Sequence, residues 1–375
     1  MNFIEEFKSG QEGRNIGLHT GICGNVFDEA TNGIQHGAVY SLGAAPKVGK
    51  TTFADQAFLL TPYMQMSKDP SINIEWLYFS YEISRVRKEF KLAPYFFKTV
   101  YNIRGFTYKD KKYRICSNYL LGRLKDKETG ELIKVSTEHK EMLKTIYNDY
   151  LVKIFGEYNS SGRLLKKGKV SFYEKRETPT GIAKIIREYA KQNGTLIYGA
   201  TKVKNDQGQT VEKNGVIAYK PNNPDKHHII IIDHLRKLKH ERGMDERLTI
   251  NKMLEYEVEL RNLCKFTFVN IIHLNRSIGS VDRMKFAEDS IYPTGDDFKS
   301  SGNISEESDY VITLFNPRDE KFKLEKHFGV DITKYPNYRS IHLVESRDTD
   351  CPFHIGGIID AEANMFNELP KPKKE

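Results

Sequence analysis

A short loop rich in small residues, 43–52, constrains the fold more than any other stretch, because it contains the triplet Gly49-Lys50-Thr51. Residues 38–42 before it favour a β-strand, and residues 53–60 after it have the spacing of a helix. Strand, small-residue loop and helix in this order are typical of a phosphate-binding P-loop, in which backbone N–H groups and the helix N-terminus surround phosphate oxygens. The sequence therefore predicts an α/β protein with a nucleoside triphosphate site.

The P-loop motif assigns a chemical role to its last residues. Lys50 is placed to reach the β- and γ-phosphates, and the Thr51 hydroxyl is placed to ligate Mg²⁺. The alternative is an ordinary Gly-rich turn, which the flanking strand and helix disfavour. We expect ATP and Mg²⁺ as the bound groups. The predicted nucleotide-binding residues are Ala44, Ala45, Pro46, Lys47, Val48, Gly49, Lys50, Thr51 and Thr52.

Composition narrows the class of protein. With 375 residues, of which 39% are hydrophobic, the chain can bury one large core or two smaller ones. No apolar run approaches the length of a membrane span, and the N-terminus lacks the features of a signal peptide. The four cysteines are scattered without a Cys-x-x-Cys pair, which indicates reduced thiols in a cytosol and argues against a zinc site. The net charge of +8 fits a polyanionic partner without requiring one.

Four consecutive isoleucines, 229–232, followed by Asp233 form the second strong pattern. Such an apolar run predicts a central parallel strand that is covered on both faces. An acid at the end of a buried strand is common in α/β proteins, but together with a P-loop upstream it indicates a Walker B acid. Asp233 is therefore expected to hold Mg²⁺ beside Thr51. His227 and His228, at the start of the strand, are interpreted as structural residues and not as metal ligands.

Two further predicted strands, 72–80 and 266–273, are followed or ended by polar groups, Glu82 and His273. Ligands of open α/β sheets bind at the carboxyl ends of the parallel strands. Glu82 could deprotonate the attacking water, or it could simply be an acid favoured by a helix dipole. His273 could sense the γ-phosphate, or it could be a hydrogen-bonded core imidazole.

Two segments look like additions to the core. Residues 101–168 combine a small hairpin, a polar turn and an amphipathic helix, with interleaved aromatic and basic side chains. They could stack nucleic-acid bases, or form a packed accessory element with solvated lysines. Residues 195–225 alternate like a second hairpin and are expected to be an appendage. A long loop, 276–301, is typical of a functional or disordered segment.

Taken in order, these motifs resemble the RecA-fold ATPase domain of the replicative hexameric, DnaB-type helicases, including bacteriophage members. The resemblance covers residues 16–95 and 168–360. It implies a RecA-like P-loop core with a mostly parallel central sheet flanked by helices, plus an inserted hairpin and helix segment. The family usually also carries an N-terminal helical domain, whereas residues 1–15 alone precede the match here. The segments that carry the resemblance are 17–21, 33–37, 44–51, 79–84, 230–235, 273–277, 301–312 and 345–348.

The resemblance implies a role for each matching residue. Lys50 and Thr51 bind phosphate and Mg²⁺, Glu82 is the catalytic base, and Asp233 is the Walker B acid. His273 stands where the family carries a sensor of the γ-phosphate. Arg347 falls on the family's arginine finger, which is supplied across a subunit interface to the neighbour's ATP.

The family's central channel is lined by the loops that follow the Walker B strand and the sensor strand. Both loops are basic here, as contact with the backbone of single-stranded DNA requires. The alternative is ordinary solvated surface charge. The predicted DNA-binding residues are Arg236, Lys237, Lys239, Arg242, Arg276, Arg283 and Lys285.

These inferences combine into one expected function. The chain is expected to be an ATP-hydrolysing motor on single-stranded DNA, a replicative DnaB-like DNA helicase that works as a homo-oligomeric, hexameric ring. It would act in the cytoplasm, that of the host if the protein is viral, with replication proteins as further partners and no membrane. The alternatives are a RecA-like recombination ATPase that forms filaments and a nucleotide-switched protein-binding scaffold.

The domain organisation follows from the same match. Residues 1–15 are expected to form an N-terminal arm, and residues 16–365 a RecA-like ATPase domain. That domain carries the insertions at about 101–168 and 195–225. The charged, proline-containing end, 366–375, is expected to be a disordered tail.

Overall fold

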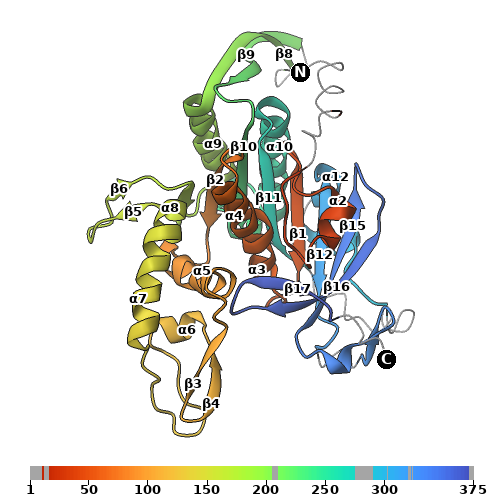
Figure 1. Ribbon diagram of the computed structural model, residues 1–375. Helices are drawn as coiled ribbons and strands as arrows, with labels where there is room; N and C mark the ends of the chain where they lie inside the picture. The colour runs from red at the N-terminus through yellow and green to blue at the C-terminus, as the bar shows by residue number, and fades with distance from the viewer. Residues whose placement is uncertain are drawn as a thin grey trace.

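A nine-stranded sheet forms the centre of the molecule, in the order β17-β16-β15-β12-β1-β11-β10-β2-β7. The computed structural model describes residue 11 and residues 17–204, 210–274, 290–301, 303–319, 322 and 324–370. The six adjacent strands from β12 to β7 run parallel, whereas β15, β16 and β17 pair antiparallel at one side (Figure 1). The expected α/β fold with a mostly parallel central sheet is confirmed.

The central strands are buried on both faces, which explains their uniformly apolar sequences. All four isoleucines 229–232 have no exposed surface. The strands of the sheet are β1 (Val39–Ala44), β2 (Asn73–Ser80), β7 (Val170–Tyr173), β10 (Lys226–Asp233), β11 (Thr267–His273), β12 (Tyr310–Phe315), β15 (Tyr338–Ser346), β16 (Phe353–Asp360) and β17 (Met365–Glu368).

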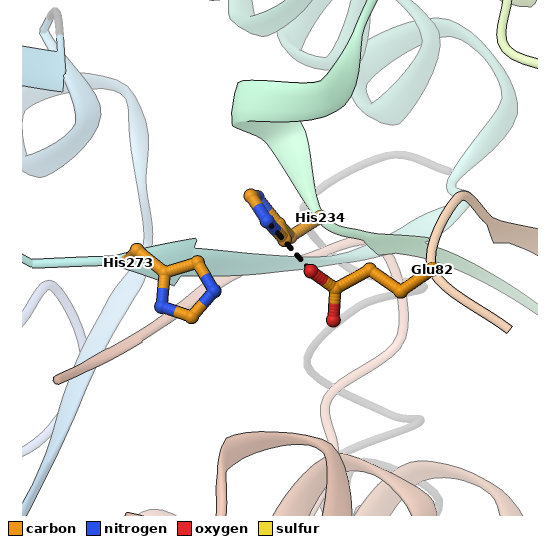
Figure 2. A group of neighbouring side chains, drawn as sticks. All are labelled: Glu82, His234 and His273. Carbon is orange, nitrogen blue, oxygen red and sulfur yellow. Dashed lines mark ion pairs between the residues drawn. The ribbon is translucent and has the colours of Figure 1, made fainter. Parts of the chain in front are cut away.

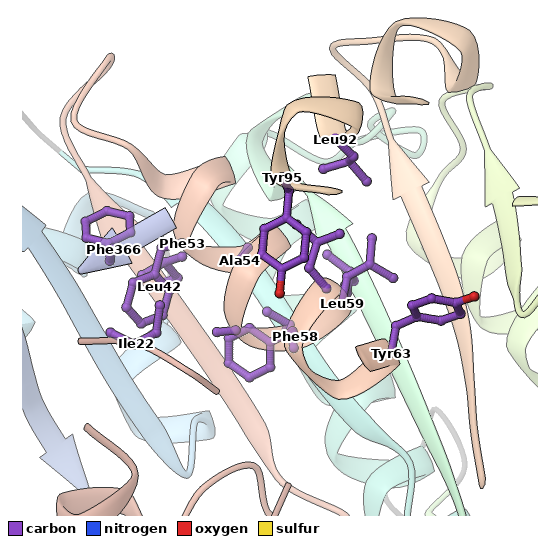
Figure 3. Packing of buried hydrophobic residues seen from close by; sticks show 14 of the residues in the cluster. Ile22, Leu42, Phe53, Ala54, Phe58, Leu59, Tyr63, Leu92, Tyr95 and Phe366 are labelled. Carbon is purple, nitrogen blue, oxygen red and sulfur yellow. The ribbon is translucent and has the colours of Figure 1, made fainter. Parts of the chain in front are cut away.

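Helices cover both faces of the sheet, and each face has its own hydrophobic core. On one face, α3 (Lys50–Asp55), the π-helical turn η1 (Gln56–Leu60) and α4 (Thr61–Lys68) follow one another directly, with α5 (Arg85–Thr99) beside them. Figure 3 shows side chains of this face packed against Leu42 of β1. The other face is covered by α9 (Pro179–Asn193) and α10 (Glu246–Cys264) (Figure 1).

Both helices of this second face begin at side chains that satisfy their first backbone N–H groups. The Thr178 hydroxyl accepts from the N–H of Gly181, and Pro179 occupies the first helical position, where its missing N–H costs nothing. The Asp245 carboxylate accepts from the N–H of Leu248. Local sequence therefore fixes where each helix starts.

The two additional segments lie outside the central sheet. In the described part of the chain, none of their strands pairs with it. The first segment contacts α5, and the second, a long hairpin, extends from the end of α9 (Figure 1). Their elements are β3 (Gly105–Tyr108), β4 (Lys111–Arg114), α6 (Ser117–Leu120), α7 (Thr137–Ile146), η2 (Tyr147–Leu151), α8 (Val152–Phe155), β5 (Glu157–Tyr158) and β6 (Leu164–Lys166), then β8 (Gly194–Lys204) and β9 (Thr210–Pro221).

Short elements complete the described chain. They are α2 (Val26–Thr31), η3 (Leu235–Lys237), η5 (Gly295–Ser301), α12 (Ile304–Glu307), β13 (Lys326–His327), β14 (Val330–Asp331) and η6 (Ile332–Lys334). All four cysteines are free. Among the described residues, no helix combines the length and the apolar character needed to cross a bilayer.

The C-terminal segment corrects one prediction. Residues 366–368, assigned to a disordered tail, belong to β17, which pairs with β16. Phe366 is 1% exposed, and its ring packs edge-on against Phe53 of α3. Gln56, the first residue of the π-helical turn, accepts a hydrogen bond from the backbone N–H of Phe366. An apolar side chain on a short edge strand thus outweighs the charged composition that follows it. Residues 371–375, and the arm 1–15 apart from Gln11, lie outside the described residues.

Candidate active site

The register of the parallel strands brings four strand ends together at one edge of the sheet. Ala44, the last residue of β1, lies opposite His273, the last residue of β11. Asp233, the last residue of β10, lies opposite Ser80, the last residue of β2. β11 and β10 are themselves neighbours. Because all four strands point the same way, the residues at their carboxyl ends share one edge, where open α/β sheets bind ligands.

A cavity of about 570 Å³ opens at this edge. Eight of the predicted site residues line it: Lys47, Gly49, Lys50, Thr51, Thr52, Glu82, Asp233 and His273. No motif in the sequence pointed to the others, which are Lys91, Arg114, His234, Ile271, Asn337, Arg339, Ile359, Ala361 and Glu362. The P-loop, the Walker B strand and the two further strand ends therefore face a single space.

The P-loop turns in a way that needs glycine. Lys47 and Gly49 both have positive φ, 64° and 120°, and α3 begins at Lys50. A Cβ atom at Gly49 would collide with the side chain of Ile359, so the site admits no other residue without a shift. The first turn of α3 presents its free N–H groups to the cavity, which makes it a binding site for anions.

Lys50 is folded back onto the loop that carries it. Its ammonium donates to the carbonyl oxygens of Ala44 at 2.9 Å and Ala45 at 3.0 Å. It also lies 3.0 Å from Nδ1 of His273. An ammonium can only donate, so Nδ1 is the acceptor and the ring proton is on Nε2. Burial lowers the pKa of Lys50 to about 8, although Asp233 and Glu82 oppose the shift.

Glu82 and His234 form the other half of the cavity wall. The Glu82 side chain is 41% exposed, and its Oε1 lies 3.2 Å from Nε2 of the buried His234 (Figure 2). The ring of His234 stands perpendicular to that of His273, with the ring centres 4.5 Å apart. Burial, followed by nearby lysines, lowers the pKa of each imidazole to about 4. Both rings are therefore neutral near pH 7.

Asp233 is suited to a hard cation. Its carboxylate is almost fully buried, and Oδ2 lies 3.5 Å from the Tyr78 hydroxyl. Burial raises the pKa of Asp233, and the ammonium of Lys88 opposes that shift. The Thr51 hydroxyl and the Asp233 carboxylate line the same cavity. Hydroxyl and carboxylate oxygens are the ligands that Mg²⁺ prefers, so the residues present fit this ion.

A buried network behind the cavity joins three elements. Lys88 of α5 has no exposed surface, and its ammonium lies 2.6 Å from both Asp55 Oδ1 and the Tyr78 hydroxyl. Tyr78 in turn contacts Asp55 at 3.1 Å and Asp233 at 3.5 Å. The network connects the helix after Glu82 with the P-loop helix and the Walker B strand. Sequence reasoning missed it, because Lys88 stands among other basic residues of a helix.

Two arginines in the cavity wall come from distant parts of the chain. Arg339 of β15 donates from Nε to the carbonyl oxygen of Val48, inside the P-loop, at 3.0 Å. Arg114, at the end of β4, reaches the cavity from the first additional segment and lies 3.4 Å from Asp360. Neither residue stands in a local motif, so only the folded chain identifies them.

Arg347 lies at the opposite edge of the sheet. It directly follows β15, which runs antiparallel, and Ser346 pairs with the first residue of β12. Its guanidinium donates to the carbonyl oxygen of Glu306 at 2.8 Å and lies 3.4 Å from Asp309. The six residues of β1 separate the two edges by about 20 Å. Arg347 therefore cannot reach the cavity of its own chain.

The predicted DNA-binding residues have different surroundings. Arg236 lies 2.6 Å from Glu246 and donates to the carbonyl oxygen of His273 at 3.3 Å, so its guanidinium is partly engaged. Lys237 is half-buried, whereas Lys239 and Arg242 are exposed. The remaining three, Arg276, Arg283 and Lys285, lie outside the described residues.

The fold and the site together define a RecA-like P-loop ATPase fold. Two solved structures cover nearly the whole chain. The ATPase domain of a phage helicase has a TM-score of 0.60 and 14% identity, and the match covers 98% of this chain and 99% of that one. A DnaB-like replicative helicase, described with its interactions with primase, has a TM-score of 0.62 and 13% identity, over 98% of this chain and 66% of that one.

At this identity the likeness concerns the fold. The chain has the fold of the ATPase domains of DnaB-like helicases, which confirms the resemblance at that level. It spans 66% of the length of the DnaB-like helicase that it matches. No family model matches the sequence. No curated protein matches it either.

Proposed function

We propose that this protein is an ATP-hydrolysing motor that acts on single-stranded DNA, a DnaB-like replicative DNA helicase. One observation carries the proposal. Lys50, Glu82, Asp233 and His273, which come from four strand ends, line a single cavity on a fold shared with DnaB-like helicase ATPase domains. A cavity with this set of groups is suited to hydrolysis of a nucleoside triphosphate and not merely to its binding.

Each of these residues has a distinct task in the proposed reaction. The first turn of α3 and the ammonium of Lys50 bind the β- and γ-phosphates, and Lys50 leaves the carbonyl oxygens of Ala44 and Ala45 to do so. Thr51 and Asp233 would hold Mg²⁺, which neutralises charge on the phosphate oxygens. Glu82 takes the proton of the attacking water, for which its exposed carboxylate is accessible.

His273 is proposed to report the presence of the γ-phosphate. Its Nδ1 is bound to Lys50 before nucleotide arrives. When Lys50 moves to the phosphates, this nitrogen loses its donor and the ring becomes free to turn. The backbone carbonyl oxygen of His273 accepts from Arg236, so a shift of this strand end would be felt at the start of the basic loop after Asp233.

The proposed assembly is a homo-oligomeric ring, a hexamer, in which Arg347 serves the neighbour's cavity. Support comes from its position, because Arg347 cannot reach its own cavity. Single-stranded DNA would pass through the channel, with replication proteins as further partners. The proposed DNA contacts are Lys237, Lys239, Arg242, Arg276, Arg283 and Lys285, with Arg236 both bracing His273 and facing this loop.

The test is the rate of ATP hydrolysis with and without single-stranded DNA, together with the mass of the protein in a non-hydrolysable ATP analogue. We expect stimulation by DNA and the mass of a hexamer. Electron microscopy on single-stranded DNA adds a second criterion, since helical filaments in place of rings would favour a recombination ATPase. No DNA binding at any salt concentration would favour a protein-binding scaffold instead.

A further inference from the structure

Three side chains with metal-binding atoms converge on one wall of the cavity. Glu82 follows β2, His234 follows β10, and His273 ends β11, so the sheet register holds all three together. One ligand atom from each lies within 4.8 Å of the other two. Figure 2 shows the carboxylate between the two rings, with one nitrogen of His273 turned toward it. The cluster is separate from the oxygen ligands Thr51 and Asp233.

His234 supplies an independent sign that something binds here. Its side chain is 3% exposed, yet among the described residues neither of its ring nitrogens has a hydrogen-bond partner of good geometry. Nε2 merely lies within ion-pair distance of Glu82. A buried polar group without a partner costs about 1–3 kcal/mol, so such a group in a cavity wall points to a ligand.

We propose that Glu82, His234 and His273 form a transition-metal site, which Zn²⁺ occupies when no nucleotide is bound. Two neutral imidazoles and a carboxylate are the ligands of many zinc sites that keep a fourth position open for water. Tetrahedral zinc with bonds of about 2.0–2.1 Å places its ligand atoms about 3.3 Å apart. The 3.2 Å between Glu82 Oε1 and His234 Nε2 meets this requirement. A modest turn of His273 brings in the third ligand.

The donor set also predicts selectivity. Mg²⁺ prefers oxygen ligands, whereas imidazole nitrogen favours zinc and other late transition metals. The scattered cysteines argued against a zinc site, but this cluster uses none of them. Excess Mg²⁺ should therefore leave the site to zinc.

Lys50 opposes metal binding in this state. Because its ammonium donates to Nδ1 of His273, the ring proton sits on Nε2, the nitrogen that would have to bind the metal. The positive charge of Lys50 also repels a cation at this wall. Removing that charge should therefore tighten zinc binding, which an adventitious surface site would not do.

Occupancy of the site would stop hydrolysis, a consequence that rests on the proposed function. The metal would hold the carboxylate of Glu82, so that it could not accept a proton, and it would fix His273. Zinc binding itself does not depend on that assignment. The two can therefore fail separately, because binding is measured without nucleotide.

The test is a zinc titration of the whole, nucleotide-free chain by calorimetry, in excess Mg²⁺. We expect one ion whose affinity falls by about 100-fold or more in His234→Asn and in Glu82→Gln, and rises about tenfold or more in Lys50→Met. Since Glu82 is exposed, Glu82→Gln should fold even if His234→Asn does not. Circular dichroism of each variant checks this.

Two matched controls place the ion. His354→Asn removes a histidine that lies 2.7 Å from His342, a second imidazole pair, and Cys351→Ser removes an exposed thiol. Both should bind zinc like the wild type, and Co²⁺ in the site should show the absorption of nitrogen and oxygen ligands without sulfur. Loss of zinc in either control, unchanged affinity in Glu82→Gln, or no gain in Lys50→Met would overturn the proposal.

Discussion

The ammonium of Lys50 lies 3.0 Å from Nδ1 of His273, so the P-loop lysine and the histidine at the end of β11 occupy each other before a nucleotide arrives. The lysine cannot bind phosphate without releasing the histidine. Recognition of nucleotide and release of the proposed sensor are therefore one event. The two residues lie 223 positions apart in the chain, and the pairing of β1 with β11 brings them together.

Replacing the P-loop lysine should abolish nucleotide binding. In Lys50→Ala the cavity loses the charge that faces the phosphates, and the carbonyl oxygens of Ala44 and Ala45 lose their donor. We expect neither ATP binding nor hydrolysis, measured by calorimetry and by phosphate release. Lys47→Ala is the matched control, because Lys47 is exposed on the same loop and should retain most of the binding. Comparable losses in both variants would contradict a special role for Lys50.

Removing the proposed base should separate binding from chemistry. Glu82→Gln keeps the shape of the side chain but cannot accept a proton, so kcat should fall by about 10²–10⁴ while nucleotide affinity stays close to that of the wild type. The measurement is ATP hydrolysis beside the Kd for a non-hydrolysable analogue. Glu138→Gln, at an exposed position on α7, should have no effect. Unimpaired hydrolysis in Glu82→Gln would assign the base elsewhere.

The location of Arg347 predicts complementation between two inactive variants. Arg347→Ala alone should lose about 10³–10⁵ in hydrolysis if it serves the transition state of a neighbour. Lys50→Ala alone should also be inactive. In mixed oligomers, an intact P-loop meets an intact Arg347 at some interfaces, so the mixture should hydrolyse ATP when neither variant does. Mixed assemblies that remain inactive would mean that Arg347 does not act across an interface.

The buried pair of Lys88 and Asp55 should matter for stability. Lys88→Met leaves the Asp55 carboxylate buried without its main partner, which should lower the free energy of unfolding by about 3–5 kcal/mol. Adding Asp55→Asn should recover part of the loss, because the unpaired charge disappears. Urea denaturation measures both. Lys191→Met, which breaks an exposed pair with Glu188, should cost about 1 kcal/mol or less. An equally small loss in Lys88→Met would show that the buried pair contributes nothing.

Glu257 should make stability depend on pH. Burial raises the pKa of this carboxyl from 4.5 to about 8. Between these values the unfolded chain ionises while the folded protein keeps the proton, so stability falls as the pH rises, by about 1.4 kcal/mol per pH unit. Glu257→Gln cannot ionise and should lack this loss. Denaturation of both proteins from pH 5 to 9 checks it, with Glu255→Gln, exposed on the same helix, as the control. Parallel curves for wild type and Glu257→Gln would refute the assignment.

Much of the site could be predicted because its motifs are local. The P-loop, the isoleucine run before Asp233, and the strands before Glu82 and His273 each reveal a strand end. Parallel pairing then brings those ends together. His234 was missed although it directly follows Asp233, because nothing in the sequence says that its ring turns into the cavity.

Other site residues could not be predicted, because their roles depend on contacts between distant segments. Arg339 reaches the P-loop from β15, 291 residues away. Arg114 reaches the cavity from a segment outside the central sheet. Lys88 looks like a surface lysine until α5 is laid on the sheet. The charged tail concealed Phe366, whose burial comes from its place on an edge strand.

The link between β17 and the P-loop helix also bears on the order in which this protein can be made. Gln56 and Phe366, joined by a hydrogen bond, are 310 residues apart. The ribosome delivers the P-loop helix early, but the strand that covers it emerges only near the end of synthesis. A nascent chain therefore carries its nucleotide-binding helix with one side open, and the site cannot close while translation is under way.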